Sequence, residues 1–253
     1  MTARSLTDRS RIRIGTDWKT VFAFEPIGIV HSCFREKFGI PRQPGLVSAA
    51  RATLELRPPY AQPAAVRGLE DFSHLWLLFV FHGLPERRWQ PTVRPPRLGG
   101  NRRLGVFATR SPFRPNPLGL SAVRLEKIVM GSGGITLHLA GVDLLDGTPV
   151  LDIKPYVPYA DSLLAAAGGF APEAPSAERD VEFSPQAAVF CANWPQGDLR
   201  ELITQILRQD PRPAYVRKSG DAALQSYGMK LYDFDVKWEV LETTVYVTDI
   251  SQF

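Results

Sequence analysis

The stretch GVFATRSPFRPNPLGLSAV, residues 105–123, interrupts strand-like sequence with a stiff, cationic segment. The apolar residues on either side of it, Val106–Phe107 and Leu118–Val123, are typical of β-strands. Between them lie three prolines, two arginines and an asparagine. Each proline fixes φ, which reduces the conformational entropy lost when such a segment binds a ligand. The stretch predicts a β-rich protein that presents a shaped, positively charged loop.

Short apolar or alternating runs surround this stretch, and turns with glycine or proline separate them. These runs are VFAFEPIGIV, ATLELR, HLWLLFVF, GVFAT, SAVRLEKIVM and ITLHLAGV. Helical periodicity is almost missing from this part of the chain. The pattern indicates a mainly β domain over residues 21–165, either a barrel or a sandwich, and we favour the barrel.

The remaining chain divides into a tail, a linker and a small second domain. Residues 1–20 are polar and basic without periodicity and are expected to form a mobile tail, and residues 166–182 have the Ala, Gly, Pro and Ser content of a linker. In residues 183–253, GDLRELITQILRQDP has helical spacing, with Asp198 and Glu201 as a capping box. LYDFDVKWEV alternates and can pair with TTVYVTDI as a hairpin. We therefore expect a small C-terminal α+β domain.

Composition limits the classes of function. The 253-residue chain has a formal net charge of +4 and an isoelectric point near 9.2, which favours an anionic partner. Its two cysteines, Cys33 and Cys191, lie far apart, so we expect no disulfide and a reducing cytoplasm. The longest apolar run, residues 75–81, is too short to span a membrane. The four histidines lack the spacing of metal ligands, so no metal is expected.

Arginine is concentrated in one part of the chain. Eight arginines lie between residues 87 and 114 without one intervening Asp or Glu: Arg87, Arg88, Arg94, Arg97, Arg102, Arg103, Arg110 and Arg114. Guanidinium groups bind phosphate bidentately and stack on bases, whereas a merely soluble surface mixes charges of both signs. This tract predicts an anion-binding surface, and a solvated basic loop is the alternative.

Four motifs, in order, resemble the TrmO (YaeB-like) family. They are EKFGIPRQPGL, VRGLEDFSHLWLLFVFH, TVRPPRLGGNRRLGVFATRSPFRPNPLGLS and DLLDGTPVLDIKPYVPYADS, and QDPRPAY at residues 209–215 resembles the family's C-terminal domain. The resemblance implies a β-barrel, non-Rossmann methyltransferase that is homodimeric. It also implies that the enzyme uses S-adenosylmethionine to methylate N6 of N6-threonylcarbamoyladenosine next to the anticodon of tRNA. The missing GxGxxG motif agrees with this expectation.

The resemblance also implies site residues. The family's cofactor-binding positions fall on Pro41, Arg42, Gln43, His82, Gly83, Arg110, Leu120, Asp146, Gly147, Thr148 and Pro149. The residues expected to face tRNA are Arg97, Arg102, Arg103, Arg114, Asn116, Asp152, Lys154 and Tyr215. An arginine can bind the cofactor's carboxylate, and an Asp-Gly turn lets the backbone approach a ligand, although Asp-Gly is also a plain hairpin signal.

Several alternatives stay open at this stage. Asp152 and Lys154 are either catalytic or a structural ion pair, so no catalytic base is assigned. A non-enzymatic RNA-binding module would also explain the arginines. A methyltransferase acting on a small molecule or a protein would keep the cofactor site without needing so long an arginine tract.

Overall fold

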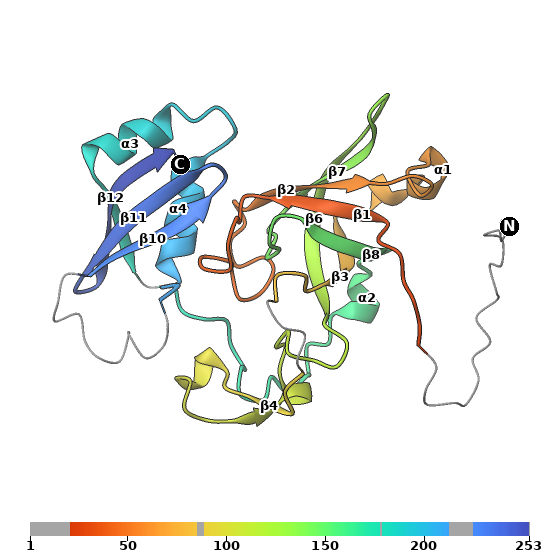
Figure 1. The fold of residues 1–253 in the computed structure, drawn as a ribbon, viewed down its shortest axis with the longest axis horizontal. Coiled ribbons are helices and arrows are strands. Elements are labelled where there is room, and N and C mark those ends of the chain that lie inside the picture. Colours follow the sequence, from red (N-terminus) through yellow and green to blue (C-terminus); the bar gives the residue numbers. More distant parts are fainter. Residues whose placement is uncertain (1–20, 85–88, 178, 213–224, 253) are drawn as a thin grey trace, which may run out of the picture.

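The N-terminal half of the protein is a closed six-stranded barrel, seen in a computed structural model that describes residues 21–84, 89–177, 179–212 and 225–252 (Figure 1). Neighbouring strands are antiparallel. In order around the barrel they are β1 (Gly28–Ser32), β2 (Arg51–Leu56), β7 (Gly134–Ala140), β6 (Leu118–Gly131), β3 (His74–Val80) and β8 (Thr148–Pro155). The barrel, and not the sandwich, is therefore the architecture of this domain.

Alternating side chains fill the barrel. On β3, Leu75, Leu77 and Phe79 are buried while their neighbours along the strand are more exposed, as expected when successive side chains point to opposite faces. Gly119 on β6 lies opposite Phe79. A Cβ atom at Gly119 would lie 2.2 Å from the Phe79 ring, so this core requires glycine there.

Two of the expected strands are wrong in extent. VFAFEPIGIV forms a strand only from Gly28, and Pro26, two residues earlier, has no N–H to donate to a ladder. GVFAT ends its pairing at Gly105 and turns into a 3₁₀ helix, η3 (Val106–Ala108), because both the N–H and the hydroxyl of Thr109 bond to the Val106 carbonyl. Strand β8 is not among the six apolar runs, but it contains Asp152 and Lys154, whose spacing of two residues is that of one strand face.

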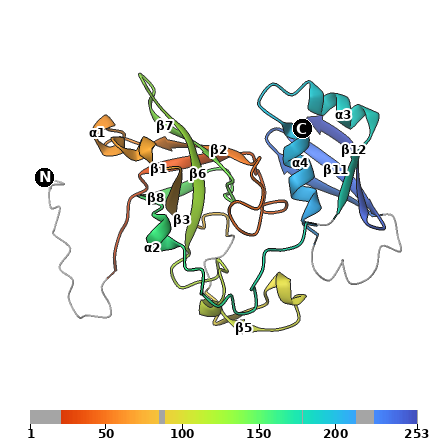
Figure 2. The same ribbon diagram turned by 180° about the vertical axis from the view of Figure 1, so that it is seen from behind.

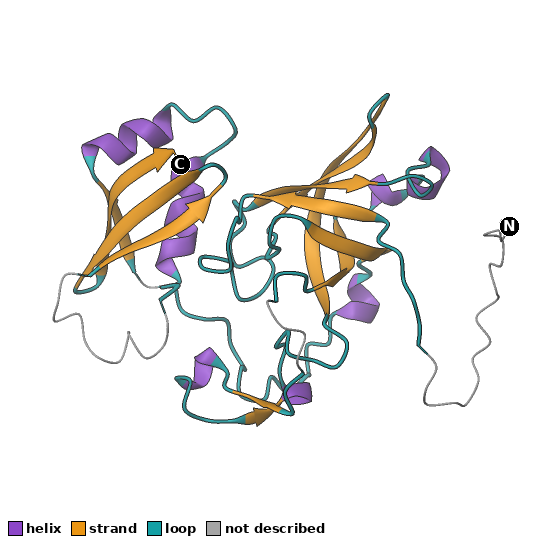
Figure 3. Cartoon of the chain, viewed as in Figure 1, coloured by secondary structure: helices purple, strands orange, loops and turns teal. Residues whose placement is uncertain are grey.

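The C-terminal domain is a four-stranded sheet with two helices (Figure 3). Its strands, in spatial order, are β10 (Ser226–Leu231), β11 (Phe234–Leu241), β12 (Thr244–Gln252) and β9 (Asp180–Phe183), and its helices are α3 (Pro185–Ala192) and α4 (Leu199–Arg208). Strands β12 and β9 are parallel. This arrangement confirms the α+β prediction.

The amphipathic helix and the hairpin are confirmed in detail, with one correction. Helix α4 buries its five apolar residues, and the Asp198 carboxylate caps it by accepting the Glu201 N–H at 2.9 Å. Strands β11 and β12 form the expected hairpin. Tyr232 was placed in the alternating strand, but it lies in the β10–β11 turn with φ of +52°. Left-handed backbone of this kind ends strand pairing.

Smaller elements complete the described structure. Residues 89–117 form an excursion beside the barrel that contains a two-stranded ribbon (Figures 1 and 2). The elements are α1 (Pro63–Val66), η1 (Leu69–Asp71), β4 (Thr92–Val93), η2 (Pro96–Leu98), β5 (Leu104–Gly105) and α2 (Pro158–Asp161). Between Asp161 and Asp180 the described residues form neither helix nor strand. Among the described helices, none has the length and apolar character to cross a membrane.

Candidate cofactor and nucleic-acid site

Three long loops leave the barrel at the same end. Residues 33–50 join β1 to β2, residues 81–117 join β3 to β6, and residues 141–147 join β7 to β8. The antiparallel register brings the ends of these loops together, because Arg51 pairs with Ala140, Val30 pairs with Thr148, and Phe79 pairs with Val150. The loops carry most of the expected cofactor residues: Pro41, Arg42, Gln43, His82, Gly83, Arg110, Asp146 and Gly147, with Thr148 and Pro149 at the start of β8.

The turn before β8 is fastened to the end of β1. The N–H of Asp146 donates to the Phe34 carbonyl, and the N–H of Gly147 donates to the Val30 carbonyl, both at 2.9 Å. The Asp146 carboxylate accepts the Ser32 N–H at 3.0 Å and is also hydrogen-bonded to the Arg35 guanidinium. The side chain of Asp146 is thus engaged within the protein, where it fixes the shape of its turn.

His82 faces the same turn from the end of β3. Its Nδ1 atom lies 3.4 Å from the Thr148 hydroxyl, which donates to the Leu145 carbonyl at 2.6 Å. Gly147 has φ of +77°, and a Cβ atom there would lie 3.7 Å from His82 Nε2. Because glycine has no Cβ, a ligand can approach the backbone closely at this position beside the imidazole.

Gln43 and Arg110 meet between two of the loops, where a guanidinium N–H donates to the Gln43 amide oxygen. Ser121 on β6 donates its hydroxyl to Asp143 at 2.6 Å. Burial raises the pKa of the Asp143 carboxyl to about 6, although the Ser121 hydrogen bond and the charge of Arg110 act in the opposite direction. This end of the barrel therefore combines arginine, amide and a carboxyl group.

Two arginines of the tract, Arg103 and Arg114, are hydrogen-bonded within the 81–117 loop itself. Arg114 is partly buried, donates to the carbonyls of Thr109 and Val106 at 2.7 and 3.3 Å, and lies 5.6 Å from the centre of the exposed Phe107 ring. Arg103 donates to the Thr92 hydroxyl at 3.0 Å, while Arg97 and Arg102 are exposed. Arg114 shapes the segment, and the other arginines give it a cationic surface. Arg87 and Arg88 lie outside the described residues.

Leu120, Asp152 and Lys154 lie on the barrel wall and not in the loops. Leu120 on β6 is 54% exposed, and it stands in one row across the sheet with Leu78 and Asp152. Lys154 and Asp152 form an ion pair of 3.0 Å on one face of β8. Asn116 is exposed at the end of the 81–117 loop, two residues before β6. Tyr215 lies outside the described residues.

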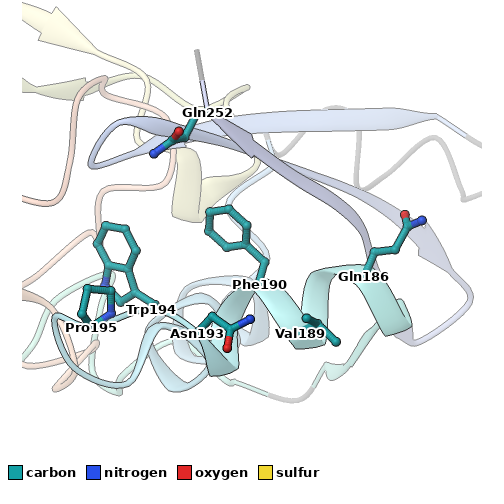
Figure 4. Close-up of a pocket in the computed structure, with 7 residues that line it drawn as sticks. All are labelled: Gln186, Val189, Phe190, Asn193, Trp194, Pro195 and Gln252. Carbon is teal, nitrogen blue, oxygen red and sulfur yellow. The ribbon is translucent and has the colours of Figure 1, made fainter.

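A cavity of about 540 Å³ lies elsewhere, on the C-terminal domain (Figure 4). Residues of helix α3 and of the segment after it line it together with the end of β12: Gln186, Val189, Phe190, Asn193, Trp194, Pro195 and Gln252. None of these residues is an expected cofactor residue. Within the described part of the chain, no three His, Cys, Asp or Glu side chains gather as metal ligands do.

Four participants in the site were missed from the sequence. Arg35 and Ser32 hold the Asp146 carboxylate, and Asp143, which feels the charge of Arg110, accepts a hydrogen bond from Ser121. Asp143 precedes the Asp-Gly pair by three positions in the DLLDGTP motif, so its place in that motif was the available signal. Arg35 carried no signal of its own, because its two partners are 111 and 197 residues away.

The fold and the site define a two-domain β-barrel protein whose long loops gather at one end of the barrel. Comparison with protein-family models matches residues 29–162 to the tRNA-methyltransferase O N-terminal domain and residues 176–253 to the TrmO C-terminal domain. Together these two models cover most of the chain. The chain belongs to the TrmO family.

Individual relatives and solved structures agree with this assignment. The chain is 52% identical over 225 residues to a tRNA (adenine(37)-N6)-methyltransferase of Escherichia coli, which covers 87% of this chain and 94% of that protein. It is 54% identical over 216 residues to a Pseudomonas aeruginosa protein provisionally named an S-adenosylmethionine-dependent methyltransferase, over 84% of this chain and 90% of that one. A crystal structure of TrmO from Pseudomonas aeruginosa superposes with a TM-score of 0.76 at 44% identity, covering 92% and 99% of the two chains.

Proposed function

We propose that this protein transfers the methyl group of S-adenosylmethionine to N6 of the adenosine next to the anticodon of tRNA, in its threonylcarbamoylated form. The relatives named as tRNA (adenine(37)-N6)-methyltransferases and the family assignment support the reaction. The structural observation that carries the proposal is the common origin of the three loops at one end of the barrel, because it brings distant cofactor positions together.

The chemistry of these loops fits the cofactor. Arg42 and Arg110 carry guanidinium groups that suit its carboxylate, and the Gln43 amide is hydrogen-bonded to Arg110. The left-handed Gly147 allows the ligand to approach the backbone beside His82. When bound, S-adenosylmethionine supplies a methyl group on a sulfonium sulfur. The loops serve to align that methyl group with the nucleotide, which is the main source of rate for an in-line displacement.

The exposed arginines suit the anionic substrate. Arg97, Arg102 and Arg103 are exposed on the 81–117 loop that also carries His82 and Arg110, and exposed guanidinium groups attract a phosphate backbone. A plain RNA-binding module would not require the Pro41–Gln43 and Asp146–Pro149 clusters, and it should bind no S-adenosylmethionine. We therefore prefer the enzyme.

The homodimer and the cytoplasmic location are also part of the proposal. The homodimer follows from the family resemblance. The cytoplasmic location follows from the two cysteines, which are free and buried and agree with a reducing compartment. Light scattering of the purified protein tests the dimer. A mass near 28 kDa, that of one chain, at micromolar concentration would contradict it.

The direct test of the reaction is mass analysis of nucleosides from tRNA incubated with the protein and isotopically labelled S-adenosylmethionine. We expect one labelled methyl group on the threonylcarbamoyl nucleoside. Binding of the cofactor alone is tested by calorimetry on Arg42→Ala, which should bind more weakly by about 1.5–3 kcal/mol because a charge-assisted hydrogen bond is lost. Unchanged affinity would remove Arg42 from the site.

A further inference from the structure

The loop of residues 33–50, which carries Pro41–Gln43, lies between the barrel and the C-terminal domain (Figures 1 and 2). Its first residues are paired with the C-terminal sheet. Phe34 forms a β-bridge with Leu231, and the N–H of Tyr232 donates to the Cys33 carbonyl at 2.8 Å. The start of the loop therefore pairs with β10, an edge strand of the C-terminal sheet.

The middle of the loop also packs on the C-terminal domain. The Glu36 carboxylate accepts the Lys230 N–H at 3.0 Å, and the Phe38 ring stacks on Trp238 with centroids 6.5 Å apart and planes 2° from parallel. Gly39 faces β10 so closely that a Cβ atom there would lie 3.2 Å from the sulfur of Met229.

The end of the loop is held by helix α4. The side chain of Gln205 accepts the Ala49 N–H at 3.0 Å, and the side chain of Gln209 donates to the Leu46 carbonyl at 2.7 Å. The C-terminal domain thus contacts the loop at its start, middle and end. The shape of this cofactor loop depends on a domain that supplies none of the expected cofactor residues.

Arg35 connects this contact to the Asp146 turn. Its Nε atom donates to the Tyr232 carbonyl at 2.8 Å, and its terminal nitrogen donates to the Asp146 carboxylate. One planar guanidinium can satisfy both acceptors at once, whereas a lysine ammonium is a single point charge on a flexible stem. Tyr232 belongs to the C-terminal domain and Asp146 to the barrel domain, so Arg35 links the Asp146 turn to the C-terminal domain.

We propose that Arg35 is a positioning residue for the cofactor site: it acts through Asp146 to hold the turn of residues 146–148, and it takes its own support from the C-terminal domain. This inference rests on the proposed function, since it assigns S-adenosylmethionine to that turn. On this proposal the C-terminal domain contributes to cofactor binding through Arg35, in addition to any contribution it makes to binding tRNA.

Arg35→Met tests the role directly, because methionine keeps an apolar stem and removes both hydrogen bonds. Arg124→Met is the matched control: the Arg124 side chain is 51% exposed against 46% for Arg35, and it pairs at 2.7 Å with Glu126 on the barrel wall. By calorimetry we expect Arg35→Met to bind S-adenosylmethionine about tenfold more weakly, as the loss of a charge-assisted contact implies. The control should stay within about twofold of wild type. Equal affinity in wild type and Arg35→Met would overturn the inference.

A double-mutant cycle separates positioning through Asp146 from an independent contribution. If Arg35 acts through Asp146, adding Arg35→Met to Asp146→Asn should weaken binding by no more than about twofold beyond Asp146→Asn alone. Losses that multiply in the double variant would show that Arg35 acts by another route.

Hydrogen exchange tests the positioning without any cofactor. The N–H of Gly147 is hydrogen-bonded to Val30 on β1, and the N–H of Asp146 to Phe34 two residues after that strand, so a peptide covering residues 144–150 reports on the turn. We expect at least threefold faster exchange there in Arg35→Met and unchanged exchange in Arg124→Met. Unchanged exchange in Arg35→Met would overturn the inference. A wild-type protein that binds no S-adenosylmethionine would instead overturn the proposed function, and the exchange result would still decide whether Arg35 holds the turn.

Discussion

The hydroxyl of Ser121 donates a 2.6 Å hydrogen bond to Asp143, whose carboxyl group feels the charge of Arg110. Ser121 is almost fully buried on β6. Burial raises the pKa of the Asp143 carboxyl from 3.8 to about 6, so near neutral pH the barrel contains a carboxylate at an energetic cost. The buried charge of Asp143 therefore lowers the stability of the folded protein near neutral pH, and Asp143 belongs to the candidate site.

Asp143→Asn should change the pH dependence of stability. Because the folded-state pKa is raised, the folded protein keeps a proton between pH 4 and 6 that the unfolded chain releases, and wild-type stability falls as pH rises through that window. Asparagine keeps an acceptor for Ser121 without the charge. We expect it to be more stable than wild type at pH 8, by at most about 3 kcal/mol, and to lose that advantage at pH 4.

Denaturant unfolding at the two pH values measures this difference, with exposed Asp180→Asn as the control. A stability difference between wild type and Asp143→Asn that does not vary with pH would contradict the assignment of a raised pKa.

Gly147→Ala should weaken cofactor binding beyond its effect on folding. Gly147 and Gly68 have nearly the same left-handed backbone, with φ of +77° and +80°, so alanine should cost each variant about 1–2 kcal/mol of stability. Only at Gly147 does the new methyl group face His82, whereas Gly68 has open space around it. Thermal unfolding should shift alike in the two variants, and calorimetry should show weaker S-adenosylmethionine binding for Gly147→Ala alone. Equal affinities would remove the turn from the site.

Local patterns in the sequence predicted what depends on local physics. Helix α4 and the β11–β12 hairpin follow from spacing and capping within a few residues, and both are present. Tyr232 alternates in sequence as a strand residue would, but tertiary contacts place it in a turn: its N–H bonds to Cys33, and its ring packs on Trp194 and Phe234. Such long-range contacts override local preference.

The candidate site shows the same limit. The family resemblance named positions on separate motifs, and the barrel register explains why most of them meet at one end. The resemblance did not reveal that the Asp146 carboxylate is hydrogen-bonded to Arg35, or that Arg114 donates to carbonyls of its own loop. Both contacts depend on the folded path of the loops, which no single motif encodes.

Binding of tRNA should depend steeply on salt, and the exposed arginines of the 81–117 loop should account for part of the slope. Replacing Arg97, Arg102 and Arg103 together with alanine should flatten the dependence of affinity on salt concentration, because fewer counterions are released from the phosphate backbone. The matched control removes the same charge from three exposed arginines elsewhere on the barrel domain, Arg57, Arg67 and Arg124. If both triple variants give the same slope, the tract is not the RNA-binding surface.

The central claim is that the enzyme methylates threonylcarbamoylated adenosine in tRNA. The adduct adds a carbonyl, a hydroxyl and a carboxylate, and a site arranged around those groups leaves donors unpaired when they are missing. The most direct measurement compares methyl incorporation from labelled S-adenosylmethionine into one tRNA sequence prepared with and without the threonylcarbamoyl group. We predict methylation of the modified tRNA at a rate at least about a hundredfold above that of the unmodified transcript. Comparable rates on the two RNAs, or no labelling of either, would contradict the account.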